Sequence, residues 1–428
     1  MPRSVSSLQS LISSLKAMHL SHLSLTHFRN YQHLELDFPE RVTLLQGENA
    51  QGKTNLLEAI FFLATSKPVH AQTEREVVDW RATEEPIPYS RVAGHVKNEK
   101  GELDLEILLS PRTGSATFTK LVKINGVNRR SMDLVGQLRA VLFLPEDIKL
   151  VDGAPGERRR YLDIALCQLD RTYLRALSAY QKVLAQRNSL LRALYEAEAR
   201  PAAESTEAQL SFWDEQLVQQ GSQVIVRRQQ FVSQLNQSAC QHHAELSGGR
   251  ETLRLYYLPA FNPGHLSDAD FAGLTNERNG SWPAPAPATL DAATVAEHYL
   301  AKLRARRSRE LAAGTTLYGP HRDDLRFVAN GHNLRTFGSR GQQRTAALAL
   351  KLAEVSVSNA TTGVTPVLLL DDVMSELDAH RRQTLLAVLH GTQQVIITTT
   401  DLDDFTPEFQ AAAQLLYVQN GAVKPTHP

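Results

Sequence analysis

Residues 47–54, GENAQGKT, constrain this chain more than any other segment. They match the pattern G-x-x-x-x-G-K-[ST], and they stand between an apolar run at 42–45 and a segment, 56–63, in which leucine and isoleucine recur at helical spacing. A strand, a glycine-bearing loop and a helix in this order form the context that a phosphate-binding loop requires. The sequence therefore predicts an α/β domain with such a loop at the end of a strand.

The residues of this loop have distinct tasks. Its glycines let backbone N–H groups turn inward on a phosphate, Lys53 directs a positive charge toward the β- and γ-phosphates, and the Thr54 hydroxyl can ligate Mg²⁺. A chance loop ahead of a helix is the alternative, and both the motif and its context argue against it. The predicted nucleotide-binding residues of the loop are Gly47, Glu48, Asn49, Ala50, Gln51, Gly52, Lys53 and Thr54.

A second candidate for chemistry lies at residues 367–372, VLLLDD. Four apolar residues predict a buried central strand, and Asp371 follows at its carboxyl end, where α/β sheets place ligands. There Asp371 can hold Mg²⁺, with Thr54 as the other metal ligand, and Asp372 can orient the attacking water. Two acidic residues that cap the next helix are the alternative. Because a phosphate loop is also present, we interpret Lys53, Asp371 and Asp372 as catalytic.

The third candidate is SRGQ at residues 339–342, placed just before a predicted helix from about 342 to 354. A serine and a glycine at a helix N-terminus present free N–H groups and a positive dipole to an anion. Serine is also simply a common helix cap, so the segment alone is a weak signal. Its position ahead of the Asp371 strand favours a nucleotide contact by Ser339, Gly341 and Gln342.

Strand patterns lie at both ends of the chain and helical patterns lie in the middle. One α/β domain, formed by residues 18–152 and 314–428, is therefore predicted to be split by a helical arm at 153–313. Residues 1–17 read as a disordered tail or as a start assigned too early, with Met18 as the real first residue.

The predicted elements follow from the hydrophobic period. In the arm, one amphipathic helix runs from about 162 to 195, a second stripe spans 210–235, and a third helix covers about 291–313, with a Pro/Ala-rich loop at 281–289 between the last two. In the head, strands are expected at 101–109, 117–124, 141–144 and 395–399, and a hairpin at 325–328 and 334–337.

Composition excludes several classes of protein. No apolar run approaches the ~18 residues that a membrane helix needs. Cys167 and Cys240 are the only cysteines, which excludes a disulfide framework or a cysteine-built zinc site and fits the cytoplasm. Lys+Arg and Asp+Glu both number 46, so bulk electrostatics does not drive nucleic-acid binding and any DNA contact needs a local patch.

The arm carries 19 Lys/Arg against 17 Asp/Glu, so only clusters are candidates for a DNA patch. A solvated helix face is the alternative for each cluster. The clusters lie at 158–160, 227–228 and 304–309, with Arg129 and Arg130 on the head as a further pair. The residues we select as DNA contacts are Arg129, Arg130, Arg304, Arg306 and Arg307.

Taken in order, these motifs resemble an ABC-type ATPase head, and the family they resemble is RecF, the bacterial DNA replication and repair ATPases. The resemblance extends from Met18 to the C-terminus, and its most specific parts are GPHRDD, GQQRT and LDDV-x-SELD. The matching segments are FRNY at 28–31, GENAQGKTNLLEAI at 47–60, LPED at 144–147, GERRRYLD at 156–163, YGPHRDDL at 318–325, SRGQQRTAALALKLAE at 339–354 and LLLDDVMSELD at 368–378.

The resemblance implies a dimer that forms on ATP and Mg²⁺, in which residues 339–342 of one subunit close over residues 47–54 of the other. It places Asp378 at that interface, and Arg29 and Asn30 near the nucleotide. It also implies binding to duplex and gapped DNA, partners of the RecR and RecO type, and indirect loading of RecA, without any membrane. A catalytic role for His321 in GPHRDD stays open.

Two departures from the wider ABC pattern predict slow hydrolysis, suited to a timer rather than a motor. Asp372 stands where many ABC ATPases carry glutamate, and threonines at 398–400 stand where a switch histidine is common.

Other classes of P-loop protein fit less well. A transporter ATPase subunit keeps its phosphate loop and Ser-Gly-Gln segment close in sequence. A structural chromosome ATPase needs long coiled coils, whereas a helix from 157 to 198 reaches only about 60 Å. A GTPase needs an N-K-x-D motif, which is missing.

Overall fold

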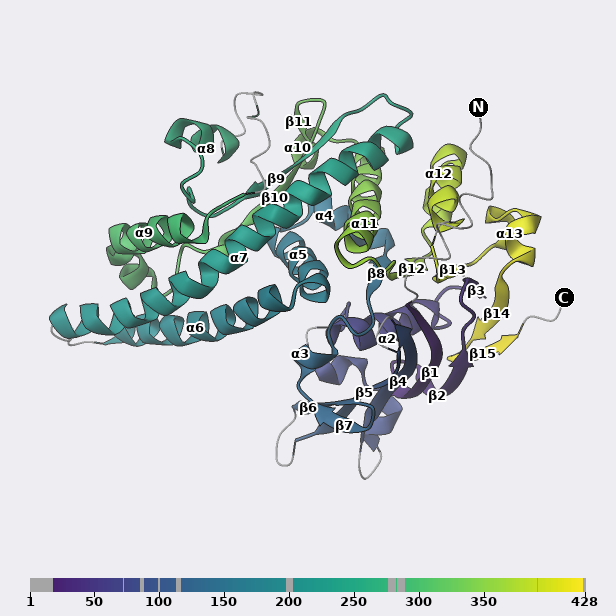
Figure 1. Ribbon diagram of the computed structural model, residues 1–428. Helices are drawn as coiled ribbons and strands as arrows, with labels where there is room; N and C mark the ends of the chain where they lie inside the picture. The colour runs from purple at the N-terminus through teal and green to yellow at the C-terminus, as the bar shows by residue number, and fades with distance from the viewer. Residues whose placement is uncertain are drawn as a thin grey trace. The chain divides into compact units, whose positions relative to one another are not determined.

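The computed structural model describes residues 18–71, 73–84, 88–98, 101–112, 117–197, 203–275, 282, 289–390 and 392–425 (Figure 1). The chain forms two compact units, one from residues 1–147 and 354–428 and the other from residues 148–353. The first unit is thus an α/β head built from both chain ends, as predicted. The predicted tail at 1–17 and most of the Pro/Ala-rich loop at 281–289 lie outside the described residues.

A mostly parallel six-stranded sheet is the framework of the head. Its central strands are apolar and buried, as is typical of a parallel sheet with both faces covered. Since the parallel strands β3, β13 and β12 point the same way, the loops that follow them meet at one edge. The strand order is β15 (Ala422–Pro425), β14 (Gln414–Gln419), β3 (Val42–Gln46), β13 (Val395–Thr399), β12 (Val367–Asp371) and β8 (Ala140–Phe143), and only the β14–β15 pair is antiparallel.

An antiparallel sheet forms the second layer of the head, and α2 (Lys53–Thr65) packs against strands of both sheets. This double contact explains why most of α2 is buried. The remaining helices of the head are α3 (Ser131–Leu134), α12 (Ala379–His390) and α13 (Pro407–Ala411). The strand order of this sheet is β2 (Tyr31–Asp37), β1 (His19–Phe28), β4 (Ser90–Asn98), β5 (Gly101–Pro111), β6 (Phe118–Ile124) and β7 (Val127–Arg129).

The second unit combines long helices with a small antiparallel sheet. Helices α6 (Arg171–Glu196) and α7 (Ala203–Leu246) lie side by side, and α9 (Ala292–Ala313) packs on both (Figure 1). The other elements are α4 (Lys149–Asp152), α5 (Pro155–Leu169), α8 (Asp268–Thr275), α10 (Leu334–Phe337) and the sheet β11 (His332–Asn333), β10 (Asp324–Ala329), β9 (Leu253–Leu258). Helix α11 (Arg340–Thr362) begins in this unit and ends in the head.

Two predicted elements of the second unit were wrong, and one strand was not predicted. The single helix from 162 to 195 is interrupted at Asp170, whose backbone is extended and whose carboxylate accepts the N–H groups of Thr172 and Tyr173 to cap α6. The expected strand at 334–337 is helix α10, because Asn333 caps it. Strand β9 was missed altogether.

The pairing of β9 with β10 bears on the predicted domain boundaries. It joins residues 324–329, which we expected in the head, to the middle of the chain, so the compact units divide at 147/148 and 353/354 instead of 152/153 and 313/314. Within the described ranges, every helix is too short or too polar to cross a membrane.

Candidate nucleotide site

The phosphate loop connects β3 to α2 through a strongly curved backbone. Gly52 has φ 116° and Ala50 has φ 64°, both in the left-handed region that favours glycine. The Lys53 ammonium group donates to the carbonyl of Glu48 at 2.9 Å and also to that of Gly47. Burial lowers the pKa of Lys53, and the neighbouring carboxylates Asp372 and Asp371 act in the opposite direction. The loop therefore holds a shielded cation inside its curve.

Asp371 is the centre of a hydrogen-bond cluster at the ends of three parallel strands. The Thr54 hydroxyl donates to one of its oxygens at 2.8 Å, and the Thr398 hydroxyl donates to the other at 2.7 Å. Thr398 also accepts the N–H of Asp372 at 3.0 Å. In the sequence, Thr398 was noted only because a switch histidine is common at this place. Its role in orienting both aspartates was not foreseen.

Asp372 differs from Asp371 in having an unsatisfied oxygen. Its backbone has φ 48°, a strained value for a non-glycine residue, and its Oδ1 is buried without a hydrogen-bond partner among the described residues. Burial raises the pKa of its carboxyl group, an effect that the Ser375 side chain and then Lys53 oppose. A raised pKa and a free carboxylate oxygen beside a phosphate loop suit a group that orients or deprotonates water.

The chemistry of these oxygens fits magnesium. Mg²⁺ prefers oxygen ligands and usually takes only one or two from protein, the rest coming from water and phosphate. The Thr54 hydroxyl and the Asp371 carboxylate, 2.8 Å apart, are such a pair. Across the described ranges, His, Cys, Asp and Glu side chains form no cluster of three that would hold a metal without a phosphate.

Arg29 and Asn30, expected near the nucleotide, have different surroundings. The Arg29 guanidinium makes a bidentate ion pair with the buried Glu58 of α2, at 2.8 and 2.9 Å, and donates to the carbonyl of Glu76. These bonds use three of its five N–H donors and leave one on each terminal nitrogen, so its place near the nucleotide stays a prediction. Asn30 contacts the phosphate loop itself, donating to the carbonyl of Gln51 at 3.0 Å.

Residues 339–342 begin α11 and belong to the second unit. Ser339 and Gln342 form a reciprocal cap: the Gln342 N–H donates to the Ser339 hydroxyl at 3.2 Å, and the Gln342 side chain accepts the Ser339 N–H at 2.9 Å. Gly341 is exposed, and an added Cβ would meet no atom of the described residues closer than 4.0 Å. The segment is thus both a helix cap and a solvent-facing turn.

Asp378 has a structural partner on the head. It caps α12 by accepting the Arg381 N–H at 2.9 Å, and its carboxylate also pairs with the Arg381 side chain. These bonds lower the pKa of Asp378, while its side chain stays 55% exposed. It is therefore charged and accessible at neutral pH.

The arginines selected as DNA contacts do not share one environment. Arg129 and Arg304 are exposed, Arg306 is half-buried, and Arg130 is exposed but pairs with Asp133. Arg307 differs: it bonds to the buried Asp214 at 2.6 Å and keeps only 11% of its side chain exposed, which disfavours the predicted DNA contact without testing it. It contributes to packing of the second unit, because it neutralises a carboxylate that is shielded from water.

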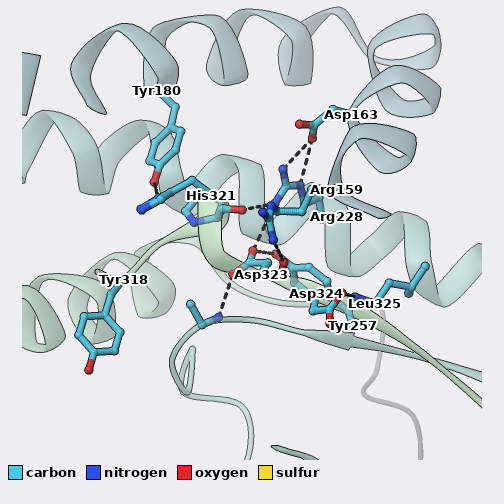
Figure 2. A network of polar contacts seen from close by, with 12 residues as sticks. Arg159, Asp163, Tyr180, Arg228, Tyr257, Tyr318, His321, Asp323, Asp324 and Leu325 are labelled. Carbon is cyan, nitrogen blue, oxygen red and sulfur yellow. Dashed lines mark hydrogen bonds and ion pairs between the residues drawn. The ribbon is translucent and has the colours of Figure 1, made fainter. Parts of the chain in front are cut away.

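The segments GERRRYLD and GPHRDD meet in a buried polar network of the second unit (Figure 2). Arg228 pairs with Asp163 at 2.7 Å and with Asp323 at 3.4 Å, and Arg158 pairs with Asp324 at 2.6 Å. Asp323 also accepts hydrogen bonds from the Tyr257 hydroxyl and the Ala260 N–H. These motifs, so specific in the sequence, therefore hold this unit together, and the buried arginines were not foreseen.

His321 lies in the same network and has no free nitrogen for catalysis. Its Nε2 donates to the Thr316 carbonyl at 3.1 Å, so its Nδ1 accepts the Tyr180 hydroxyl at 2.6 Å (Figure 2). Burial lowers its pKa to about 4. His321 is thus a neutral structural histidine.

Comparison with known proteins identifies the family. The family model of the RecF/RecN/SMC N-terminal domain matches residues 19–424. The DNA replication and repair protein RecF of Chloroflexus aurantiacus is 44% identical over 414 residues, covering 95% of this chain and 99% of that protein. RecF of Bacillus subtilis is 37% identical over 407 residues, covering 95% and 100%.

A solved structure described as the recombination mediator protein RecF with ATP in the RecFOR pathway superposes with a TM-score of 0.80 at 30% identity. It covers 97% of this chain and 99% of that chain. This chain belongs to the RecF family of DNA replication and repair proteins, which have an ATP-binding head of the ABC/SMC type.

Proposed function

We propose that this protein is an ATP-switched DNA repair and replication factor that dimerises on ATP, binds duplex DNA at gaps or junctions, and helps to load a recombinase onto single-stranded DNA. One observation carries the proposal: Lys53, Thr54, Asp371 and Asp372 meet at one sheet edge, where the Asp372 Oδ1 stays buried and unpaired among the described residues. Such an arrangement has the parts for phosphoryl transfer to water.

Each residue at this edge has a defined role. Thr54 and Asp371 would hold Mg²⁺, which neutralises charge on the phosphates. Lys53 binds the phosphates as a point charge, and Asp372 orients the attacking water and accepts its proton. Thr398 fixes Asp371 and the backbone of Asp372 in this arrangement.

Hydrolysis is slow in this proposal. The Asp372 side chain is one methylene shorter than glutamate, so it reaches less far toward the water. The Thr398 hydroxyl is engaged by the two aspartates, so it does not supply the polar contact to the γ-phosphate that a histidine would. Slow turnover suits a switch that stays closed on DNA until hydrolysis resets it.

The proposed dimer uses residues 339–342 of one subunit to close over the phosphate loop of the other. Ser339 and Gly341 are exposed and lie at the start of a long helix, where N–H groups and the helix dipole attract anions. Asp378, exposed and charged, would lie at the same interface. The cytoplasm is the compartment that fits this function.

Solution mass with and without Mg-ATP tests the dimer. Wild-type protein is expected to double in mass on Mg-ATP, and Ser339→Arg to stay monomeric. Ser267→Arg is the matched control, because Ser267 is another exposed serine whose hydroxyl caps a helix, accepting the Asp270 N–H at 3.1 Å. A mass that ATP leaves unchanged, with nucleotide binding confirmed, would overturn the composite site.

DNA contacts are proposed for the accessible arginines Arg129, Arg130, Arg304 and Arg306. Partners of the RecR and RecO type, and RecA indirectly, are proposed because the related solved protein is described as a mediator in the RecFOR pathway. If these arginines contact phosphates, DNA affinity should fall as salt rises. A plot of the logarithm of affinity against the logarithm of salt concentration should have a slope of about −0.9 for each contact. An affinity insensitive to salt would contradict this part of the proposal.

A further inference from the structure

Three Asn-Gly turns among the described residues have nearly the same backbone. The asparagines Asn125, Asn330 and Asn420 have φ of 51°, 49° and 50°, and the glycines that follow have φ of 73°, 80° and 72°. Each joins two antiparallel strands with both central residues left-handed, as a tight hairpin turn requires. At Gly126 and Gly331 an added Cβ would meet nothing within 4 Å among the described residues.

The third turn, at the tip of the β14–β15 hairpin, contacts the phosphate loop. The Gly421 N–H donates to the Gln51 carbonyl at 3.0 Å, and the Asn420 N–H donates to the Gln51 side-chain oxygen at 2.8 Å. Asn30 donates to the same Gln51 carbonyl at 3.0 Å. An added Cβ at Gly421 would lie 2.2 Å from the Asn30 carbonyl oxygen, so glycine is required there for space as well as for φ.

These bonds fix the direction of the next amide. In a trans peptide the C=O and the following N–H point in opposite directions. Two donors hold the Gln51 carbonyl, so the Gly52 N–H is turned away from the hairpin. The Tyr31 hydroxyl donates to the Gly52 carbonyl at 3.0 Å and constrains the Lys53 N–H in the same way.

We propose that the tip of the C-terminal hairpin, with Tyr31, forms a clamp that positions the phosphate loop for nucleotide binding. The clamp consists of Tyr31, Asn420 and Gly421, and its residues act through the loop without touching the nucleotide. N–H groups that already point in the right direction bind an anion more tightly, because the loop loses its conformational entropy on folding and not on binding. This inference rests on the proposed ATP site.

Gly421→Ala tests the clamp, with Gly126→Ala and Gly331→Ala as matched controls. All three substitutions force alanine into the same left-handed turn, so all should lower the thermal stability of the protein. Only Gly421→Ala is expected to weaken equilibrium binding of ATP and ADP, each about tenfold, and to speed hydrogen exchange in residues 47–53. The controls should bind both nucleotides within about twofold of wild type.

Tyr31→Phe carries the test if Gly421→Ala fails to fold, because it removes one hydroxyl and keeps the buried ring. It should weaken nucleotide binding by up to about fivefold, the limit reached if the whole free energy of that one hydrogen bond serves to order the loop. Wild-type affinity in folded Gly421→Ala or in Tyr31→Phe would overturn the clamp.

Lys53→Ala separates this inference from the function on which it rests. If Lys53→Ala still binds ATP as wild type does, the proposed nucleotide site fails and the clamp fails with it. If Lys53→Ala loses binding while Gly421→Ala and Tyr31→Phe keep it, only the clamp fails.

Discussion

Two groups of charged residues in this protein look alike in sequence but differ in their bonding. At the nucleotide edge of the head, Asp372 has a strained backbone and an oxygen that is unpaired among the described residues. In the second unit, Asp163 and Asp323 accept hydrogen bonds from Arg228 and from tyrosine hydroxyls. The carboxylate proposed to act on water thus keeps an oxygen that no described residue pairs with, whereas these two carboxylates of the second unit are paired with a cation and a hydroxyl.

The two regions also respond differently to the loss of a charge. Removing a charge from a satisfied buried pair leaves its partner unpaired, so stability falls. Removing a carboxylate whose burial is unfavourable leaves stability intact and costs only chemistry. Substitutions in the two regions should thus separate folding from function.

The largest effect on stability is expected for Arg228→Met. It leaves Asp163 and Asp323 buried without their cation, so the free energy of unfolding should fall by about 3–5 kcal/mol. Urea unfolding followed by tryptophan fluorescence measures this, since Trp213 and Trp282 lie in the same unit. Arg227→Met is the control: its side chain is 41% exposed and pairs loosely with Asp170 at 3.4 Å, so it should change stability by less than about 0.5 kcal/mol. If both variants lost the same free energy of unfolding, buried and exposed arginines of this unit would not differ as we propose.

Asp372→Asn should reduce ATP hydrolysis and leave the stability of the protein unchanged. Steady-state hydrolysis at saturating ATP should fall about 100-fold or more, the usual contribution of a positioned base. The free energy of unfolding should not fall, because burial already disfavours the charged carboxylate. The variant should also stay dimeric on ATP for longer than wild type. Dissociation as fast as that of wild type would deprive Asp372 of its assigned role.

The neutral His321 predicts a pH dependence of stability. Its pKa of about 4 in the folded state lies below the ordinary histidine value of 6.5, so the unfolded chain takes up a proton more readily than the folded protein does. The contribution of His321 to the free energy of unfolding is therefore fully present above pH 6.5 and is lost as pH falls toward 4. At pH 5 the loss amounts to roughly 2 kcal/mol. Urea unfolding of wild type and His321→Gln at pH 7 and pH 5 measures it. The variant should lose less between the two pH values, and an equal loss would refute this account of His321.

Arg306 and Arg307 offer the smallest and most local test. Arg307→Ala should lower stability because Asp214 is buried beside it, and should leave DNA binding unchanged. Arg306→Ala should leave stability unchanged. If Arg306 contacts a phosphate, the substitution should also make the slope of log affinity against log salt concentration less steep by about 0.9. DNA titrations over a range of salt, with urea unfolding, distinguish the two. If Arg307→Ala weakened DNA binding and Arg306→Ala lowered stability, burial would not distinguish structural arginines from DNA contacts in this helix.

Local patterns in the sequence predicted the phosphate loop and Asp371 because each depends on a strand and the few residues that follow it. The helix break at Asp170 was hidden, since the hydrophobic spacing of α5 continues into α6 across the capping residue. Helix α10 was misread because its four residues, LRTF, are too few to define a period, and the Asn330-Gly331 turn before them favoured a second strand.

The buried arginines could not be predicted from sequence. Their partners are distant, as with Arg158 and Asp324, which are 166 residues apart. A cluster of arginines looks the same whether it is solvated or paired in a core. The clamp on the phosphate loop was hidden for a similar reason, because only folding brings the Asn420-Gly421 turn to Gln51.

Mixing two inactive variants tests the central claim, a nucleotide site shared between subunits, most directly. Lys53→Ala and Ser339→Arg should each have almost no ATPase activity alone. A mixed dimer pairs the intact phosphate loop of the Ser339→Arg subunit with the intact Ser339 segment of the Lys53→Ala subunit, which restores one site in two. The account predicts that activity reappears on mixing, in proportion to the mixed dimer formed. If the mixture stays as inactive as its components while mixed dimers are present, the shared site is contradicted.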